Sequence, residues 1–243
     1  GDVYKRQVMK SIIDKAESRG HANHGWLDTH HTFSFANYYN PRRMSFGALR
    51  VLNDDKVAPG TGFDTHPHEN MEIVSIPLKG HLSHGDSESN QKVITVGEIQ
   101  VMSAGTGILH SEKNHSQTEP VEFLQIWVIP KHKNNRPKYN DYDIRELLLP
   151  NQWALFISPD GDAPASIDQD AWFSMGDFDA GKIIDYTLHK DNTGIYLFVL
   201  EGEIAIGDAI LSRRDGIGLY ETKQIQIKVL KKAKLLLMEV PIL

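Results

Sequence analysis

The sequence predicts an all-β protein built from two copies of one β-domain, and three observations lead to this prediction. Short runs of strand-forming residues, separated by Gly, Pro, Asn and Asp, follow one another along most of the chain. Helical periodicity is thin and is confined to residues 11–18 and 141–147. The strings "LKGHLSHGD" at 78–86 and "LEGEIAIGD" at 200–208 share Leu, Gly, Gly and Asp at identical spacing. Each reads as strand, glycine turn and strand, so we expect two copies of one β-domain.

The individual strands follow from alternation and turn residues. Ile225, Ile227 and Val229 alternate with polar residues, which is the period-2 pattern of a half-buried strand. Many short strands with turn residues at close spacing are typical of a sandwich or barrel. In chain order, the expected strands lie within "FGALRVLNDD" (46–55), "EIVSIPLKGHLSHGD" (72–86), "QKVITVGEIQVMSAG" (91–105), "VEFLQIWVIP" (121–130), "ALFISPDGD" (154–162), "IYLFVLEGEIAIGD" (195–208), "QIQIKVL" (224–230) and "KLLLMEVPIL" (234–243).

A chain of 243 residues is long enough for two domains, each with its own core. We expect an N-terminal domain at 9–130, a polar, Pro- and Asn-containing linker at 131–143 and a C-terminal domain at 144–243. Residues 1–8 precede Met9 and show no signal-peptide pattern. We expect this segment to be a non-native leader.

Composition limits the function classes. No apolar run approaches the roughly 20 residues needed to cross a bilayer, so we expect a soluble protein without a membrane partner. The net charge of −6, without a basic cluster, disfavours direct nucleic-acid binding. The absence of cysteine excludes disulfides, thiolate ligands and a cysteine nucleophile, and it weakly favours the cytoplasm.

Two short segments carry candidate metal ligands. "THPHENMEI" at 65–73 contains His66, His68 and Glu72, and "GILHSEKN" at 107–114 contains His110 and Glu112. Residues at i and i+2 of a strand share one face, so each segment can aim a pair of ligands inward. Imidazole and carboxylate donors suit Fe(II), Mn(II), Co(II), Ni(II) or Zn(II).

The fourth ligand is Glu72 or Glu112. Glu112 shares a strand face with His110, whereas Glu72 lies about 13 Å of extended chain beyond His68. Strand geometry therefore favours Glu112 without excluding Glu72.

The second copy of the repeat lacks the ligands. An ungapped shift of 122 residues places Leu188, Lys190 and Gly194 at the positions of His66, His68 and Glu72. We therefore expect one metal site per chain.

The remaining histidines are expected to be exposed or to be satisfied core groups. Most of the 12 histidines of the chain lie outside the two segments. His21 and His24, beside Trp26, are expected to be structural rather than metal-binding. The same expectation covers a list of further histidines: His30, His31, His81, His84 and His132.

These segments resemble a known family. "GTGFDTHPHENMEIVSIPLKG" resembles the first motif of the cupins, and "GEIQVMSAGTGILHSEKN" resembles the second, with two extra residues before His110. "FSFANYYNPRRMSFGALRVLNDD", "QVMSAGTGILHSE" and "LQIWVIP" are similar to the pirins more specifically. The resemblance is dense in the N-terminal half and covers the C-terminal half in outline.

The resemblance implies a bicupin, with two double-stranded β-helix (jelly-roll) barrels face to face. It implies one Fe(II)-type metal in the N-terminal barrel, bound by His66, His68, His110 and Glu112, with Mn, Co, Ni or Zn as other metals. Bacterial pirins are similar to quercetinases, which implies an oxidoreductase that opens a flavonol ring with O₂ and releases CO, with Glu112 as general base. Resemblance to eukaryotic pirins implies the alternative, a redox-sensing module that docks on a transcription factor or an enzyme.

Overall fold

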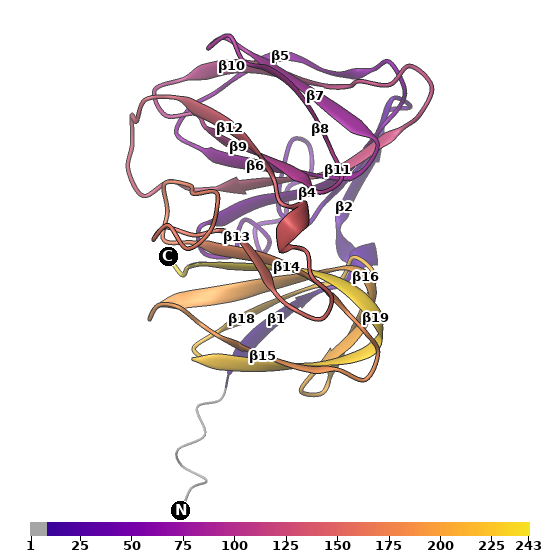
Figure 1. Ribbon diagram of the computed structural model, residues 1–243, viewed down its shortest axis with the longest axis vertical. Helices are drawn as coiled ribbons and strands as arrows, with labels where there is room; N and C mark the ends of the chain where they lie inside the picture. The colour runs from indigo at the N-terminus through magenta and orange to yellow at the C-terminus, as the bar shows by residue number, and fades with distance from the viewer. Residues whose placement is uncertain (1–8) are drawn as a thin grey trace, which may run out of the picture. The chain divides into compact units, whose positions relative to one another are not determined.

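The computed structural model describes residues 9–243, so the expected leader at 1–8 lies outside the described residues. The described chain is almost entirely β-structure, with two single-turn 3₁₀ helices, η2 (Ala16–Ser18) and η3 (Arg145–Leu147). None of the helices in this part of the chain is long and apolar enough to span a membrane. The all-β prediction is therefore confirmed (Figure 1).

The chain forms two compact units. The first barrel comprises Arg19–Arg145 together with Pro164–Gln169. The second barrel comprises the described residues up to Ser18, Glu146–Ala163 and Asp170–Leu243. The second barrel thus includes a segment that precedes the first barrel in the chain, and the first barrel includes residues 164–169 from the second half, a connectivity that the sequence repeat does not reveal.

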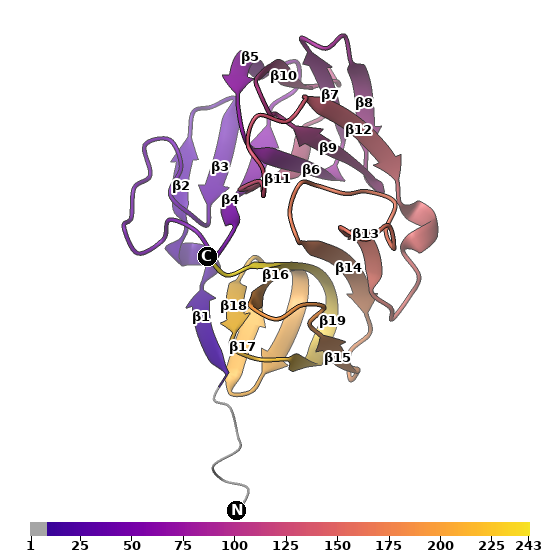
Figure 2. The same ribbon diagram turned by 90° about the vertical axis from the view of Figure 1, so that its left-hand side faces the viewer.

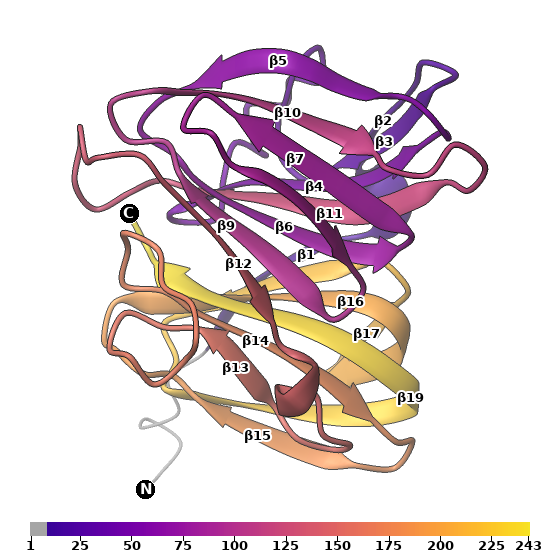
Figure 3. The same cartoon turned by 45° about the horizontal axis from the view of Figure 1, so that its top comes forward.

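The first barrel is made of two antiparallel sheets. Seven strands pair in the order β12-β9-β6-β11-β4-β3-β2, and four pair in the order β5-β10-β7-β8. Figure 3 shows the four-stranded layer with β5, β10 and β7 side by side. The strands are β2 (Gly20–Asn23), β3 (Leu27–His31), β4 (Leu49–Val57), β5 (Gly62–His68), β6 (Glu72–Lys79), β7 (His81–Asp86), β8 (Gln91–Thr95), β9 (Glu98–Ser103), β10 (Ile108–Asn114), β11 (Val121–Val128) and β12 (Lys138–Asp143).

The second barrel contains one sheet of eight strands. Six pair in the order β1-β18-β16-β19-β14-β13, while β15 pairs with β19 and β17 with β16. Figure 2 shows β1 beside β18 in this barrel. The strands are β1 (Lys10–Asp14), β13 (Ala154–Ile157), β14 (Trp172–Phe178), β15 (Ile183–Thr187), β16 (Thr193–Ile206), β17 (Ala209–Ser212), β18 (Gly216–Tyr220) and β19 (Gln224–Pro241).

Alternating burial shows how each core forms. In β19, Ile225, Ile227 and Val229 are buried as the period-2 pattern predicts, and they join the core of the second barrel. In the first barrel, Phe123 anchors one cluster of buried apolar side chains and Ile73 another. The interior of the first barrel also holds many polar groups, which is the first structural sign of a site.

Local details differ from the sequence predictions. The helix expected at 11–18 is strand β1 followed by η2, because Lys10–Asp14 pairs with β18 and tertiary pairing overrides weak local periodicity. The piece expected at 141–147 is the end of β12 followed by η3. The segment expected as a linker at 131–143 contains β12, which pairs with β9 and belongs to the first barrel.

Candidate metal centre

Two neighbouring strands position the histidine cluster. β5 and β10 are antiparallel, with His110 opposite His66 and Ile108 opposite His68. The register shifts between His110 and Glu112. The i, i+2 spacing thus brings the three imidazoles to one inner face, as the sequence predicted.

A glycine turn precedes β10. Gly105 has a φ of +50°, and a Cβ added there would lie 1.9 Å from the carbonyl oxygen of Asn135. Any larger residue would therefore displace the backbone of the chain segment that follows β11. The tight approach explains why "SAGTG" serves as the turn that leads into His110.

The three imidazoles converge through their Nε2 atoms. His110 Nε2 lies 2.8 Å from His66 Nε2 and 2.8 Å from His68 Nε2. His66 Nδ1 donates to the carbonyl oxygen of Asp64 at 2.6 Å, which leaves the Nε2 lone pair of the neutral ring facing the cluster. A proton on His110 Nε2 can be donated to only one of its two neighbours. Nε2 lone pairs of at least two rings therefore face each other at the centre of the cluster. A cation there would remove this repulsion.

Burial keeps two of these rings neutral. Burial and the neighbouring His66 lower the pKa of His68 to about 4. The pKa of His110 is lowered to about 2, mainly by burial and further by the neighbouring His68, His66 and His84. Both rings therefore present a lone pair at neutral pH, which metal binding requires.

The spacing fits a transition metal. Metal–nitrogen bonds of about 2.1 Å place cis ligands of an octahedron about 3.0 Å apart and tetrahedral ligands about 3.4 Å apart. The observed separations of 2.8 Å are closer to the octahedral value. In addition, His110 Nδ1 is buried without a hydrogen-bond partner among residues 9–243, so the ring makes its polar contacts through Nε2.

Glu112 adds a carboxylate beside the imidazoles. Its Oε1 lies 3.7 Å from His110 Nε2, and the residue is 2% exposed. Gln125 Nε2 donates to Oε1 at 2.6 Å and Ser75 Oγ donates to Oε2 at 3.3 Å. Burial raises the pKa of Glu112 to about 7, while these two hydrogen bonds oppose the rise. The group is poised to exchange a proton near neutral pH.

Glu72 points to a different environment. Its carboxylate accepts from Ser103 Oγ at 2.5 Å and from the backbone N–H of Asp168 at 2.5 Å. Burial raises its pKa, and the same two hydrogen bonds oppose the rise. Glu72 therefore anchors the 164–169 segment within the first barrel, and the geometry favours Glu112 as the fourth ligand.

Sequence reasoning missed a set of supporting side chains. His84 is a buried, paired core group, one of the two outcomes expected for it, but its ring centroid also lies 5.5 Å from that of His110, which spacing did not predict. Asp86 Oδ2 lies 2.7 Å from His84 Nε2, and Tyr139 stacks on the His84 ring at 4.1 Å. The signal available in sequence was His84 and Asp86 at i, i+2 in a strand that pairs with β10. That signal is meaningful only once the pairing is known.

A second hydrogen-bond chain supports the carboxylate. Trp127 Nε1 donates to Gln125 Oε1 at 3.1 Å, and Gln125 in turn donates to Glu112. Trp127 also packs edge-on against His68, with ring centroids 5.0 Å apart. The Trp127 indole therefore contacts His68 directly and Glu112 through Gln125.

A pocket of about 510 Å³ opens beside the cluster. It is lined by Pro67, His68, Glu69, Ser87, Gly107, Ile108 and Leu109. His66 and His68 are partly exposed, whereas His110 and Glu112 are buried. The cluster thus has one open side and one closed side.

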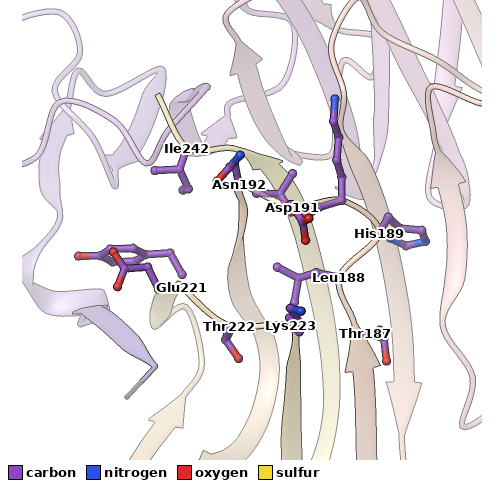
Figure 4. Close-up of a pocket in the computed structure, with 12 residues that line it drawn as sticks. Thr187, Leu188, His189, Asp191, Asn192, Glu221, Thr222, Lys223 and Ile242 are labelled. Atoms are coloured by element: carbon purple, nitrogen blue, oxygen red, sulfur yellow. The ribbon is translucent and has the colours of Figure 1, made fainter. Parts of the chain in front are cut away.

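The second barrel has a pocket of about 960 Å³ at the 187–193 loop, drawn in Figure 4. His189 Nδ1 contacts buried Glu239 at 2.9 Å, and Lys190 pairs with Asp170 at 2.5 Å. Glu221 pairs with Lys10 at 3.1 Å. These ionisable groups are held by structural partners and do not converge, so the larger pocket is the weaker candidate for chemistry.

The fold and the site together define a bicupin whose first barrel carries a His₃–Glu cluster. Comparison with known families gives the same result for both halves. Residues 13–128 match the Pirin family model, and residues 155–240 match the model of the quercetinase C-terminal cupin domain. The chain belongs to the pirin family.

The relatives agree over nearly the whole chain. A quercetin 2,3-dioxygenase of Escherichia coli (strain K12) is 39% identical over 236 residues, covering 94% of this chain and 98% of the relative. A pirin-like protein of Caulobacter vibrioides is 38% identical over 233 residues, covering 94% and 99%. The crystal structure of bacterial pirin YhhW in complex with nickel(II) from Escherichia coli superposes with a TM-score of 0.91 at 36% identity, covering 96% and 100%.

Proposed function

We propose that this protein is a metal-dependent quercetin 2,3-dioxygenase, which opens the ring of a flavonol with O₂ and releases CO. The convergence of His66, His68 and His110 at the open side of the first barrel, with Glu112 behind them, carries the proposal. The similarity to a quercetin 2,3-dioxygenase of Escherichia coli supports the substrate class.

The metal would be held by His66, His68, His110 and Glu112. We propose Fe(II), and Mn, Co, Ni or Zn share the preference for such donors. The nickel complex of a similar pirin supports a transition metal without selecting one. When bound, the metal supplies Lewis-acid and redox chemistry toward the flavonol oxygen and O₂.

Glu112 would act as the general base. Its buried carboxylate lies beside the imidazoles, where it would accept the proton of the flavonol 3-hydroxyl and return it later. Gln125 and Ser75 hold the two carboxylate oxygens, so the group keeps one orientation as its charge changes. Burial around Glu112 excludes bulk water from this proton transfer.

The pocket beside His68 would receive the aromatic substrate. Its volume of about 510 Å³ lies within the range typical of small-molecule sites. Ile108 shares the inner face of β10 with His110, and Ser87 and Glu69 offer polar groups for the hydroxyls, whereas Pro67 and Leu109 lie on the outer face of their strands. No arginine lines this pocket among the described residues, so it does not fit the tight, arginine-lined pocket expected for a small acid. The cytoplasmic location and the absence of nucleic-acid binding remain predictions.

The test measures CO release from quercetin and O₂ by protein loaded anaerobically with Fe(II). Wild type should release CO in proportion to quercetin consumed. His66→Ala should lose metal and activity, Glu112→Ala should lose activity, and exposed His115→Ala should behave as wild type. Iron binding without CO release would overturn the proposal and favour the redox-sensing alternative. That alternative predicts a protein partner whose binding differs between the Fe(II) and Fe(III) forms.

A further inference from the structure

A second group of metal-binding side chains lies on the β2–β3 hairpin of the first barrel. In β3, Leu27, Thr29 and His31 are buried, so the alternate residues Asp28 and His30 face outward. His21 of β2 lies directly opposite His30 in the antiparallel register. The hairpin therefore presents two imidazoles and a carboxylate on one outer face.

The donor atoms are already close together. His21 Nε2 lies 2.6 Å from Asp28 Oδ1, and the rings of His21 and His30 stack with centroids 4.1 Å apart and planes 3° apart. One donor atom from each of the three side chains lies within 4.8 Å of the others. Donors around one metal lie roughly 3.0 to 3.4 Å apart, so rotation of the two imidazoles out of the stack brings their lone pairs to a common point.

Charges of both signs flank the three donors. Asp54 of β4 lies opposite His30, and Arg19 pairs with Asp54 at 2.9 Å, which offsets the charge of that guanidinium. Lys56 lies opposite Asp28 and is exposed to solvent. His21 and Asp28 are themselves exposed by half and by more than a third, with side-chain values of 52% and 38%. A metal ion can reach them without displacing the barrel.

We propose that His21, Asp28 and His30 form a second site, for a divalent transition metal of the zinc, copper or nickel class. Two imidazoles and one carboxylate, with water completing the coordination, match the preference of these ions. The site revises the structural role expected for these histidines from sequence, because their cross-strand alignment is visible only in the fold. β2 is the edge strand of its sheet, so the ion would link this edge to β3.

The first measurement is calorimetric titration of the metal-stripped full-length protein with Zn(II). Wild type should bind two equivalents, each with a Kd of roughly micromolar or tighter. His21→Ala/His30→Ala should bind one equivalent, and His66→Ala/His110→Ala should also bind one, retained by the hairpin. His24→Ala is the matched control, since His24 is exposed in the same hairpin but outside the cluster, and it should bind two.

A thermal-unfolding measurement gives a second readout. Zn(II) binding to the native state should raise the Tm of His66→Ala/His110→Ala, and adding His21→Ala/His30→Ala should abolish that rise. Asp28→Asn should weaken the retained equivalent while leaving the metal-free Tm near its value in the parent variant. A single equivalent in wild type, or a second equivalent that survives His21→Ala/His30→Ala, would overturn the proposal.

Discussion

Replacing Asp55 with asparagine should make the metal-free protein less sensitive to rising pH. Asp55 lies in β4 inside the first barrel, is 5% exposed, and accepts a hydrogen bond from Thr29 Oγ1. Burial raises its pKa to about 7, the hydrogen bond from Thr29 opposes the rise, and Asp54 and Glu112 add to it. Asparagine keeps the acceptor for Thr29 and cannot ionise.

The magnitude follows from proton linkage. Below the unfolded pKa of 3.8 both states of Asp55 are protonated, and its contribution to stability is fully present. Between 3.8 and about 7 the folded state retains a proton that the unfolded chain has released. The free energy of unfolding therefore falls by up to about 1.4 kcal/mol per pH unit, or roughly 2 kcal/mol between pH 5 and 7, because folded Asp55 is already half ionised at the upper limit. The loss is complete once the pH has risen through the folded pKa.

The assay is urea unfolding of the metal-free protein at pH 5, 6, 7 and 8. Wild type should lose stability from pH 5 to 8, and Asp55→Asn should lose roughly 2–3 kcal/mol less over that range. Glu112 titrates in both proteins, so its contribution largely cancels in the comparison. Asp208→Asn, an exposed substitution in the second barrel, should follow wild type. Parallel pH profiles for wild type and Asp55→Asn would refute the reasoning.

Three further outcomes are expected. Glu112→Gln should weaken metal binding, because it removes a carboxylate donor, and Glu72→Gln should leave metal binding unchanged. Calorimetry measures both, and equal losses of affinity would contradict Glu112 as the proposed fourth ligand. Gln125→Leu should destabilise the fold by roughly 1–3 kcal/mol in urea unfolding, because buried Glu112 and half-buried Trp127 lose their hydrogen bonds to the amide. An unchanged midpoint would argue against that hydrogen-bond chain. His84→Ala should lower metal affinity about 10- to 100-fold in a chelator competition, because an aromatic support beside a ligand is lost; unchanged affinity would exclude this role.

The candidate site was predictable from sequence where its geometry is local. His66 and His68, like His110 and Glu112, sit at i, i+2 in single strands, and strand periodicity alone fixes their common face. The choice between Glu72 and Glu112 needed more than spacing. The hydrogen bonds that Ser103 and Asp168 donate to Glu72 support our proposal that Glu112 is the fourth ligand.

Other parts of the site and fold depend on pairing that spacing does not encode. His84 lies beside His110 because β7 pairs with β10, a contact between residues 26 positions apart. His21 and His30 become neighbours only through the hairpin register. β12 looked like a linker because its Lys, Asn and Asp residues are polar, yet its backbone completes the edge of the sheet beside β9.

The pairing of the first strand with a late strand sets an order of assembly during synthesis. β1 pairs with β18, so the hydrogen bonds between Lys10 and Tyr220 can form only after residue 220 has been synthesised. At about 5–20 residues per second, the interval between the two strands lasts roughly 10 to 40 s. Ile12 and Ile13, still 49% and 45% exposed in the finished fold, would spend that time unpaired. Deleting residues 10–14 would therefore spare the barrel that is synthesised first and leave an open edge at β18 in the one that closes last.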